Sequence, residues 1–466
     1  MNRNDIGVIG LGVMGANLAR NMARNQYVVS GYDVDSNKVG AFSQDHGSLI
    51  GFGALNDFIS SLRTPRQIIL LVPDRQVDNS IEMLVPLLDK HDAIIDMGNS
   101  FFKDTERRTK YVEESGLLFI GSGVSGGEYG ALHGPCIMPG GHYSAYQSIE
   151  PLLQSIAAKV DNQPCVAHIG PRGAGHYVKM IHNGIEYGIM QLIAEIYAVL
   201  QLAGNASAEE LHQLFQSWNE TELNSYLIEI TASIFSKIDE ETQKPLIDVI
   251  LDDAEQKGTG KWTCQNALDL GIATPTINAA VEARIISSFK KQRELGAKHL
   301  PISRKMAYID KDQLFDAARQ TLYSGVLCCF AQGISLMQAA SREYDYQLSI
   351  STISTIWRGG CIIRAGILND IAALYSDNPD IDNLMFSDRF GTELLERHQA
   401  FQTFVKLAVD AAVPIPALTA SLSYFDAFRT ERLPANLIQA QRDYFGSHTY
   451  RRIGKPGSFH TNWYKA

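Results

Sequence analysis

Apolar and polar residues follow two different patterns along this chain of 466 residues. Over the first third, short apolar runs are separated by amphipathic segments. The runs that we expect to form strands are Ile6–Ile9, Tyr27–Tyr32, Ile68–Val72, Ala93–Asp96, Leu117–Ile120 and Cys165–Ile169. The segments with helical spacing between them include Ala16–Arg24, Val77–Leu88 and Thr105–Glu114. This alternation predicts a parallel, doubly wound sheet.

The pattern changes after the glycine-rich segment 170–175. Long helical patterns follow, among them His182–Leu202, Asn278–Arg293 and Lys311–Ser341, and the last of these has an uncharged part from Thr321. Its serines and glutamines favour a buried helix over a membrane span. We therefore expect an α/β Rossmann domain over residues 1–174, a large all-α substrate and dimerisation domain over 175–433, and a C-terminal tail over 434–466.

Composition narrows the possible partners. The formal net charge is -10, so the chain lacks the overall positive field that would hold nucleic acid or an acidic membrane. The six cysteines include no C-x-x-C pair, which argues against structural zinc or a disulfide framework and for reduced thiols. The N-terminus runs directly into the first strand without a signal-like segment, so we expect a cytoplasmic protein.

A glycine motif follows the first strand. Gly10, Gly12 and Gly15 form G-x-G-x-x-G at the start of a helix, where the backbone approaches a dinucleotide pyrophosphate closely. A glycine turn without a ligand is the alternative. Asp33 ends the second strand at the distance expected for a carboxylate that binds the adenosine ribose, which favours NAD over NADP. Asp33 alternatively only caps its turn.

We expect further ligand contacts at the ends of later strands. Asn99 follows the strand Ala93–Asp96 and should lie near both the nicotinamide and the substrate, because ligands bind beyond the carboxyl ends of parallel strands. Ser125-Gly126-Gly127 forms a second glycine-rich loop whose amides suit a carboxylate. The expected cofactor contacts are Gly10, Gly12, Val13, Met14, Gly15, Asp33, Val72 and Asn99.

Four polar residues share one face of the helix that begins the second domain. Lys179, His182, Asn183 and Glu186 stand at i, i+3, i+4 and i+7. Lys179 and Glu186 are separated by about 10 Å along the helix axis, so their long side chains can converge on a small molecule. A solvated polar face is the alternative interpretation. Two further runs, 257–263 and 441–450, offer Lys, Arg and His for an anionic ligand.

Taken together, these motifs resemble the decarboxylating 6-phosphogluconate dehydrogenases over nearly the whole chain. The blocks that carry the resemblance are Gly7–Gly15, Gly121–Gly130, Gly134–Gly141, Gly173–Tyr187, Gly258–Thr263 and Ala435–Tyr450. The resemblance implies oxidation of 6-phosphogluconate at C3 and loss of its carboxylate, which yields ribulose 5-phosphate for the pentose phosphate pathway and gluconate utilisation. It implies a homodimer in which each tail reaches the partner, and no metal.

The resemblance also assigns roles to individual residues. Lys179 would be the general base for the C3 hydroxyl, and Glu186 the acid that protonates C1 of the enediol. The implied substrate contacts are Asn99, Ser125, Gly126, Gly127, His182, Asn183, Tyr187, Lys261 and Arg284, with Arg442 and His448 from the partner subunit. A base at neutral pH requires burial that lowers the lysine pKa.

The chain departs from the commoner pattern of that family at the cofactor site. Most members are NADP-dependent and carry Asn-Arg-Ser/Thr after the second strand, where this chain has Asp33-Val34-Asp35. After the strand Ile68–Val72 it reads Pro73-Asp74-Arg75 in place of Lys-Ala-Gly. Both changes remove positive charge or add negative charge near the expected 2′-phosphate, so we expect NAD, with NADP as the alternative.

Two other functions compete with this interpretation. A β-hydroxyacid dehydrogenase for a smaller acid would share the cofactor fold and the lysine, but it would lack the long helical domain and the Arg442–His448 segment. A non-catalytic dinucleotide sensor would be expected to have lost Lys179 or Glu186, and both are present.

Overall fold

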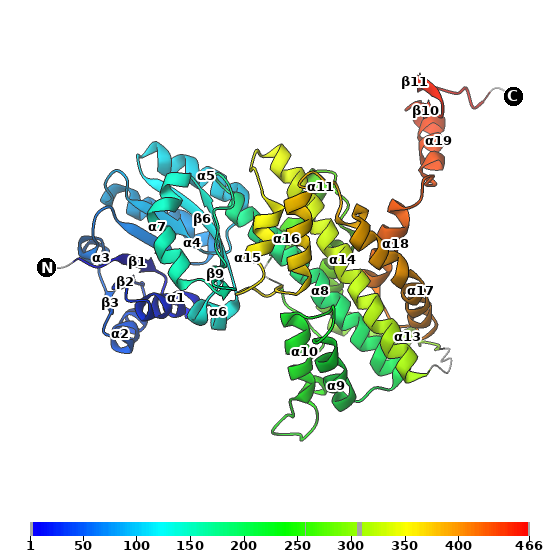
Figure 1. Ribbon diagram of the computed structural model, residues 1–466, viewed down its shortest axis with the longest axis horizontal. Coiled ribbons are helices and arrows are strands. Elements are labelled where there is room, and N and C mark those ends of the chain that lie inside the picture. Colours follow the sequence, from blue (N-terminus) through cyan, green and yellow to red (C-terminus); the bar gives the residue numbers. More distant parts are fainter. Residues whose placement is uncertain (1–2, 257, 305–309, 465–466) are drawn as a thin grey trace.

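The computed structural model describes residues 3–256, 258–304 and 310–464, and Figure 1 shows two bodies and a projecting tail. The N-terminal body contains a seven-stranded sheet in the order β3-β2-β1-β4-β5-β6-β7. Its strands are β1 (Ile6–Ile9), β2 (Val29–Tyr32), β3 (Leu49–Phe52), β4 (Gln67–Leu70), β5 (Ala93–Asp96), β6 (Leu118–Ser125) and β7 (Cys136–Gly141). Every residue of β1 and β5 is buried, as in a sheet covered on both faces.

Helices connect these strands. They are α1 (Val13–Arg24), α2 (Ser36–Asp45), α3 (Leu55–Ser61), α4 (Asp74–Leu84), η1 (Val85–Leu87), α5 (Phe102–Glu114), α6 (Gly127–His133) and α7 (Tyr143–Ile156). Neighbouring strands pair in parallel except β6 and β7, which are antiparallel. The predicted Rossmann-type domain is confirmed, with one antiparallel strand at its edge.

Three details of the predicted sheet were wrong. The strands β3 and β7 were missed, because β3 lies at the sheet edge with only Leu49 buried and β7 contains Pro139 and two glycines. The segment Cys165–Ile169 is not a regular strand. Val166 instead makes an isolated bridge to Ile137, after a short hairpin of β8 (Lys159–Val160) and β9 (Gln163–Pro164).

The second body is helical, as predicted. Its helices up to α13 are α8 (Ala174–Gly204), α9 (Ala208–Trp218), α10 (Tyr226–Ser236), η2 (Leu246–Asp248), α11 (Thr259–Asp269), α12 (Pro275–Ser287) and α13 (Lys290–His299). The later helices are α14 (Lys311–Glu343), α15 (Ile350–Ile356), α16 (Ile367–Asp377), η3 (Leu384–Phe386), α17 (Asp388–Asp410) and α18 (Pro416–Phe428). The predicted helix Asn278–Arg293 is in fact two, because exposed apolar residues such as Ile286 and Phe289 continued the pattern across the break.

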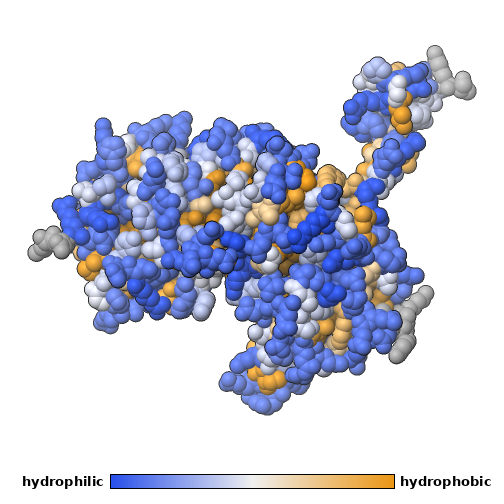
Figure 2. Space-filling model, in the orientation of Figure 1, coloured by the Kyte–Doolittle hydropathy of each residue, from blue (hydrophilic) through white to orange (hydrophobic). Residues whose placement is uncertain are grey.

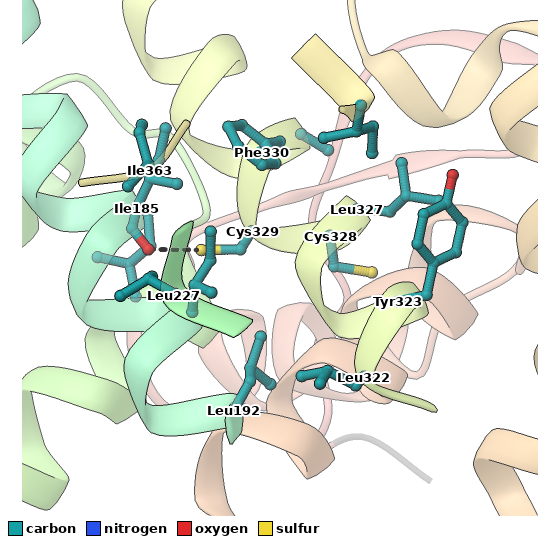
Figure 3. Packing of buried hydrophobic residues seen from close by; sticks show 14 of the residues in the cluster. Ile185, Leu192, Leu227, Leu322, Tyr323, Leu327, Cys328, Cys329, Phe330 and Ile363 are labelled. Carbon is teal, nitrogen blue, oxygen red and sulfur yellow. Dashed lines mark hydrogen bonds between the residues drawn. The ribbon is translucent and has the colours of Figure 1, made fainter. Parts of the chain in front are cut away.

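The long helices α8 and α14 form the centre of this body. Figure 3 shows Ile185 and Leu192 of α8 packed against Leu322, Cys328 and Cys329 of α14, where the Cys329 thiol donates to the Ile185 carbonyl at 3.5 Å. Both helices are long and apolar enough to cross a membrane. However, 78% of the most apolar window of α14 is buried inside the protein, which confirms the expected core helix.

The tail has its own secondary structure. It consists of α19 (Ala435–Gly446) and a hairpin of β10 (Tyr450–Arg452) and β11 (Lys455–Phe459). Figure 1 shows this unit standing away from the helical body, beyond α18. In the space-filling view of Figure 2, hydrophobic and hydrophilic residues are both visible on the part of the chain that leads to the tail.

Candidate active site

The three motif glycines meet different requirements. A Cβ on Gly10 would lie 2.4 Å from the Leu71 carbonyl oxygen, and one on Gly15 would lie 1.9 Å from the Gly10 carbonyl oxygen, so packing excludes side chains there. Gly12 has φ −68° and would meet nothing within 4 Å. The fold itself does not need a glycine at Gly12. The open space beside it fits a dinucleotide that approaches the N-terminus of α1.

The other predicted cofactor residues border this loop. Val13 and Met14 lie in the first turn of α1, where Val13 is exposed and Met14 is half-buried. Val72 follows β4, the neighbour of β1 in the sheet, and its Cγ1 lies 3.0 Å from the position of a Cβ on Gly10. The structure therefore brings these residues together at the carboxyl ends of β1 and β4.

The Asp33 carboxylate lies directly against the glycine loop. One oxygen accepts from the Leu11 N–H at 2.8 Å, and the other from the Asp35 N–H at 2.9 Å. Asp33 therefore does support its turn, as the alternative interpretation supposed. Each carboxylate oxygen can accept a second hydrogen bond, so a ribose hydroxyl remains compatible. The Lys38 ammonium lies 3.6 Å from the same carboxylate and is a cation close to this position.

A buried carboxylate holds the loop that carries Asn99. Asp96 accepts from the Gly98 N–H at 3.0 Å and from the Ser100 hydroxyl at 2.6 Å, while the Arg108 guanidinium lies 3.7 Å away. Asn99, between those two anchored residues, is exposed at the carboxyl end of β5. The position is the one expected for a residue between cofactor and substrate.

The polar stripe of α8 is buried. His182 is fully buried and Lys179 is 7% exposed. The Nδ1 atom of the His182 ring lies 3.4 Å from the Lys179 ammonium, 3.2 Å from the Asn183 amide oxygen and 3.7 Å from the Glu186 carboxylate. The other ring nitrogen lies 3.2 Å from the Ser125 hydroxyl at the end of β6. This burial excludes the solvated polar face, and the contacts bring five predicted residues together.

Burial shifts the pKa values of these groups toward the neutral forms. Desolvation lowers the pKa of Lys179 although the Glu186 carboxylate opposes the shift, and desolvation raises the pKa of Glu186 although Lys179 and Arg284 oppose it. Desolvation, with the nearby Lys179 charge, keeps the pKa of His182 well below its ordinary value. A neutral lysine and a protonated glutamate are the forms needed in a general base and a general acid.

A second group of predicted residues lies one turn further along α8. The Arg284 guanidinium of α12 stacks over the Tyr187 ring at 3.6 Å. A Cβ on Gly260 would lie 2.7 Å from the same ring, so the start of α11, with exposed Lys261, packs closely against Tyr187. These residues extend the site: the Arg284 charge acts on the Glu186 carboxylate, and Lys261 adds an exposed cation at the start of α11. Lys257, from the same sequence run, lies outside the described residues.

The Ser125-Gly126-Gly127 segment is not a free loop. Ser125 ends β6, and Gly126 and Gly127, with φ of 127° and 62°, lead into α6. A Cβ on Gly126 would lie 2.6 Å from the Gly360 carbonyl oxygen of the connection between α15 and α16. Conformation and close packing therefore favour glycine at Gly126, whereas conformation alone favours it at Gly127.

That connection supplies residues that the sequence reading missed. The Trp357 ring packs edge-on against His182 with 5.5 Å between ring centres, and the Ile362 N–H lies 3.4 Å from the Ser125 hydroxyl. The adjacent glycines Gly359 and Gly360 after Trp357 were the available signal. They indicate a backbone turn that approaches another segment closely.

Arg442 and His448 are not part of this cluster in a single chain. Both belong to the tail, Arg442 in α19 and His448 in the turn after it, and Figure 1 shows α19 apart from the body that contains α8. Among the residues that the structure describes, no group of three or more His, Cys, Asp or Glu side chains is placed to hold a metal ion.

Comparison with known proteins gives matches over both bodies. A family model described as "6-phosphogluconate dehydrogenase, C-terminal domain" matches residues 175–463, and "NAD binding domain of 6-phosphogluconate dehydrogenase" matches residues 5–170. A curated relative from Bacillus subtilis, "6-phosphogluconate dehydrogenase, NADP(+)-dependent, decarboxylating", is 50% identical over all of both chains. The Escherichia coli "6-phosphogluconate dehydrogenase, decarboxylating" is 48% identical over 99% of this chain and 100% of its own.

A solved structure matches equally broadly. The 6-phosphogluconate dehydrogenase of Plasmodium falciparum, described in its apo form and in complexes with NADP+ and with 6-phosphogluconate, has a TM-score of 0.95 and 40% sequence identity. The match covers 98% of this chain and 100% of that one.

Proposed function

We propose a function from one premise: this chain belongs to the family of decarboxylating 6-phosphogluconate dehydrogenases. It is an enzyme of that activity, which converts 6-phosphogluconate to ribulose 5-phosphate and carbon dioxide in the pentose phosphate pathway with a nicotinamide dinucleotide. The smaller-acid dehydrogenase and the non-catalytic sensor are set aside, because relatives of this activity align over the full chain.

The observation that carries the proposed mechanism is the buried stripe of α8. Lys179, which desolvation favours as the neutral amine, takes the proton of the C3 hydroxyl. A nicotinamide cofactor held at the glycine loop would supply the acceptor for the hydride that leaves C3. Carbon 3 is then a ketone β to the carboxylate, so the C1–C2 bond breaks, carbon dioxide leaves, and its electron pair forms the enediol.

Protonation completes the reaction. The protonated Lys179 stabilises the developing enolate oxygen on C3, because it is a cation in a site shielded from water. Glu186, whose pKa burial raises, gives its proton to the former C2 of the substrate, which becomes C1 of the product. His182 lies between the two groups and is hydrogen-bonded to Ser125, so it orients the substrate rather than carrying a proton.

Substrate binding is proposed to use the remaining predicted residues. Asn99, Ser125, Gly126, Gly127, Asn183 and Tyr187 would contact the sugar acid. Lys261 and Arg284 would supply positive charge from the same subunit, and Arg442 and His448 from the partner's tail in a homodimer. This arrangement is supported by the projecting tail of Figure 1 and by the absence of an overall basic charge.

We propose NAD as the preferred cofactor. The support is Asp33, whose carboxylate beside Leu11 repels a 2′-phosphate, together with the Pro73-Asp74-Arg75 sequence after β4. Lys38 is the feature that favours NADP, and the Bacillus subtilis relative is named as NADP(+)-dependent. The same proposal places the enzyme in the cytoplasm, where its six cysteines, free in the structure, stay reduced.

Initial rates with 6-phosphogluconate test the proposal when NAD and NADP are compared and carbon dioxide is followed in parallel. We expect equal amounts of reduced cofactor and carbon dioxide, and a higher kcat/KM with NAD. A higher kcat/KM with NADP would reject the proposed preference for NAD, but it would not affect the proposed reaction. Reduced cofactor without carbon dioxide would reject the proposed decarboxylation.

A further inference from the structure

The tail contains a buried carboxylate that the proposed mechanism does not use. Asp443 lies near the end of α19, and its side chain has no exposed surface. It accepts hydrogen bonds from the Thr449 N–H (3.0 Å), the His460 Nδ1 (2.9 Å), the Thr461 N–H (3.1 Å) and the Trp463 Nε1–H (2.8 Å). The donors come from the turn after α19 and from the segment after β11. One side chain therefore joins α19 to the turn that follows it and to the segment after β11.

Asp443 fixes the backbone on both sides of His448. Its carbonyl oxygen accepts from the Ser447 N–H at 2.9 Å, and its carboxylate accepts from the Thr449 N–H. Ser447 and Thr449 have φ of 51° and 60°, in a region that such residues adopt only when their surroundings hold them there. The direction of the His448 ring therefore depends on Asp443.

The same contacts reach Arg442. Its guanidinium donates to the Gln439 side-chain oxygen at 3.0 Å, and the Gln439 amide donates to the Thr449 carbonyl. A Cβ on Gly446 would lie 2.6 Å from the His448 ring, so the ring packs directly on the helix end. The positions of Arg442 and His448 thus both depend on the turn after α19, which Asp443 stabilises.

A polar centre is needed because the tail has little apolar core. Asp443 is the only buried residue of α19, while Leu437, Ile438 and Phe445 are exposed. A unit of this size cannot bury enough apolar surface to fix its own conformation. Hydrogen bonds to a charged group are about twice as strong as neutral ones, so four of them on one carboxylate can define its shape.

We propose that Asp443 is a positioning residue, which sets Arg442 and His448 in the geometry that one subunit's tail presents to the phosphate group of the substrate bound by its partner. This inference rests on the proposed function, in which the tail completes the partner's site. Asp443 itself touches neither substrate nor cofactor in that arrangement.

The variant Asp443→Asn tests the proposal. It keeps the shape of the side chain but replaces one acceptor oxygen with an NH₂ group, which then faces N–H donors. We expect KM for 6-phosphogluconate to rise about tenfold or more, since at least one charge-assisted hydrogen bond is lost, with kcat changed less than about threefold. KM for the cofactor should not change. Glu431→Gln, which removes an exposed carboxylate before α19, should behave as wild type.

A second measurement follows the tail directly. Protein labelled with 5-fluorotryptophan should give a Trp463 fluorine resonance, assigned with Trp463→Phe, that moves in Asp443→Asn because the indole loses its acceptor. An unchanged resonance and an unchanged substrate KM would overturn the inference.

Arg442→Ala separates this inference from the proposed function. If Arg442→Ala raises the substrate KM and Asp443→Asn does not, Asp443 has no positioning role and the tail still completes the site. If neither variant raises KM, the proposed role of the tail fails, and the inference fails with it.

Discussion

Lys179 owes its burial to a residue on another element. A Cβ on Gly123 of β6 would lie 2.3 Å from the Lys179 Cβ, so a larger residue at this position would push α8 away from the sheet. In this glycine-rich segment, only Ser125-Gly126-Gly127 was predicted to bind an anion through backbone amides, and Gly123 was given no role. The structure gives a steric reason for Gly123: the glycine lets α8 approach the sheet, and this approach removes the lysine from water.

The proposed cofactor preference depends on single side chains as well. In Asp33→Ala, the carboxylate that repels a 2′-phosphate is gone while Lys38 remains, so the ratio of kcat/KM with NADP to kcat/KM with NAD should rise. We expect this ratio to rise at least about tenfold. Removal of one like charge near a phosphate changes the binding free energy by about 1–2 kcal/mol at the effective dielectric constant of a protein surface.

The control for this prediction is Asp57→Ala, which removes an exposed carboxylate from α3 and should leave the ratio unchanged. An unchanged ratio in Asp33→Ala would show that Asp33 only supports its turn through the Leu11 and Asp35 N–H groups.

Among the secondary-structure elements, hydrophobic periodicity predicted the long and regular helices and the strand–helix alternation. The alternation of strands and helices up to Asp96 and the long helix patterns inside α8 and α14 correspond to observed elements. The edge strands β3 and β7 were not predicted, because β3 buries only one residue and the sequence of β7 resembles a glycine-rich turn. The polar face of α8 was found from spacing alone. Its burial was not, because it depends on glycines of β6 and on the connection after Trp357.

A buried glutamate connects α8 with α18, and no sequence pattern predicted this contact. Glu195 of α8 is 2% exposed, and its carboxylate accepts from the Ala417 and Leu418 N–H groups at 2.9 and 2.8 Å. It thereby caps the N-terminus of α18, the helix that leads to the tail. Burial raises the pKa of Glu195 to about 7 even though these hydrogen bonds oppose the shift.

This pKa predicts a pH dependence of stability. The folded protein holds the Glu195 proton more tightly than the unfolded chain, so the free energy of unfolding falls as pH rises from the unfolded pKa, near 4.5, to about 7. The fall is about 3 kcal/mol and levels off at higher pH.

Glu195→Gln lacks this titration. Denaturant unfolding of both proteins at pH 5 and pH 8 should therefore show the stability difference moving in favour of Glu195→Gln at pH 8, whatever its sign at pH 5. The same difference at both pH values would contradict the raised pKa.

For the whole molecule, the proposed arrangement leaves the site of a single chain incomplete. The Rossmann-type body offers the glycine loop, and the helical body offers Lys179 and Glu186. Arg442 and His448 belong to the tail, and Figure 1 shows its helix α19 apart from both bodies. A sequence can reveal that these residues belong to one motif set, but it does not show in which subunit they act.

Mixed dimers test the exchange of tails. A subunit with Lys179→Met has an inactive catalytic site but an intact tail. A subunit with Arg442→Ala has an intact catalytic site but a defective tail. If tails act in the partner, each mixed dimer has one complete site, and random mixing should restore about a quarter of wild-type activity at low substrate. If each tail served its own subunit, mixing would restore none.

The proposed mechanism depends on the buried Lys179 as the general base of this enzyme. The most direct test is Lys179→Met, which removes the amine and keeps an apolar side chain of similar length in the buried position. Turnover of 6-phosphogluconate should fall by about a thousandfold or more. The cofactor dissociation constant should stay close to that of wild type, because the glycine loop and Asp33 are untouched, and Lys110→Met, an exposed change on α5, should keep full activity. Turnover near the wild-type rate in Lys179→Met would show that Lys179 is not the general base.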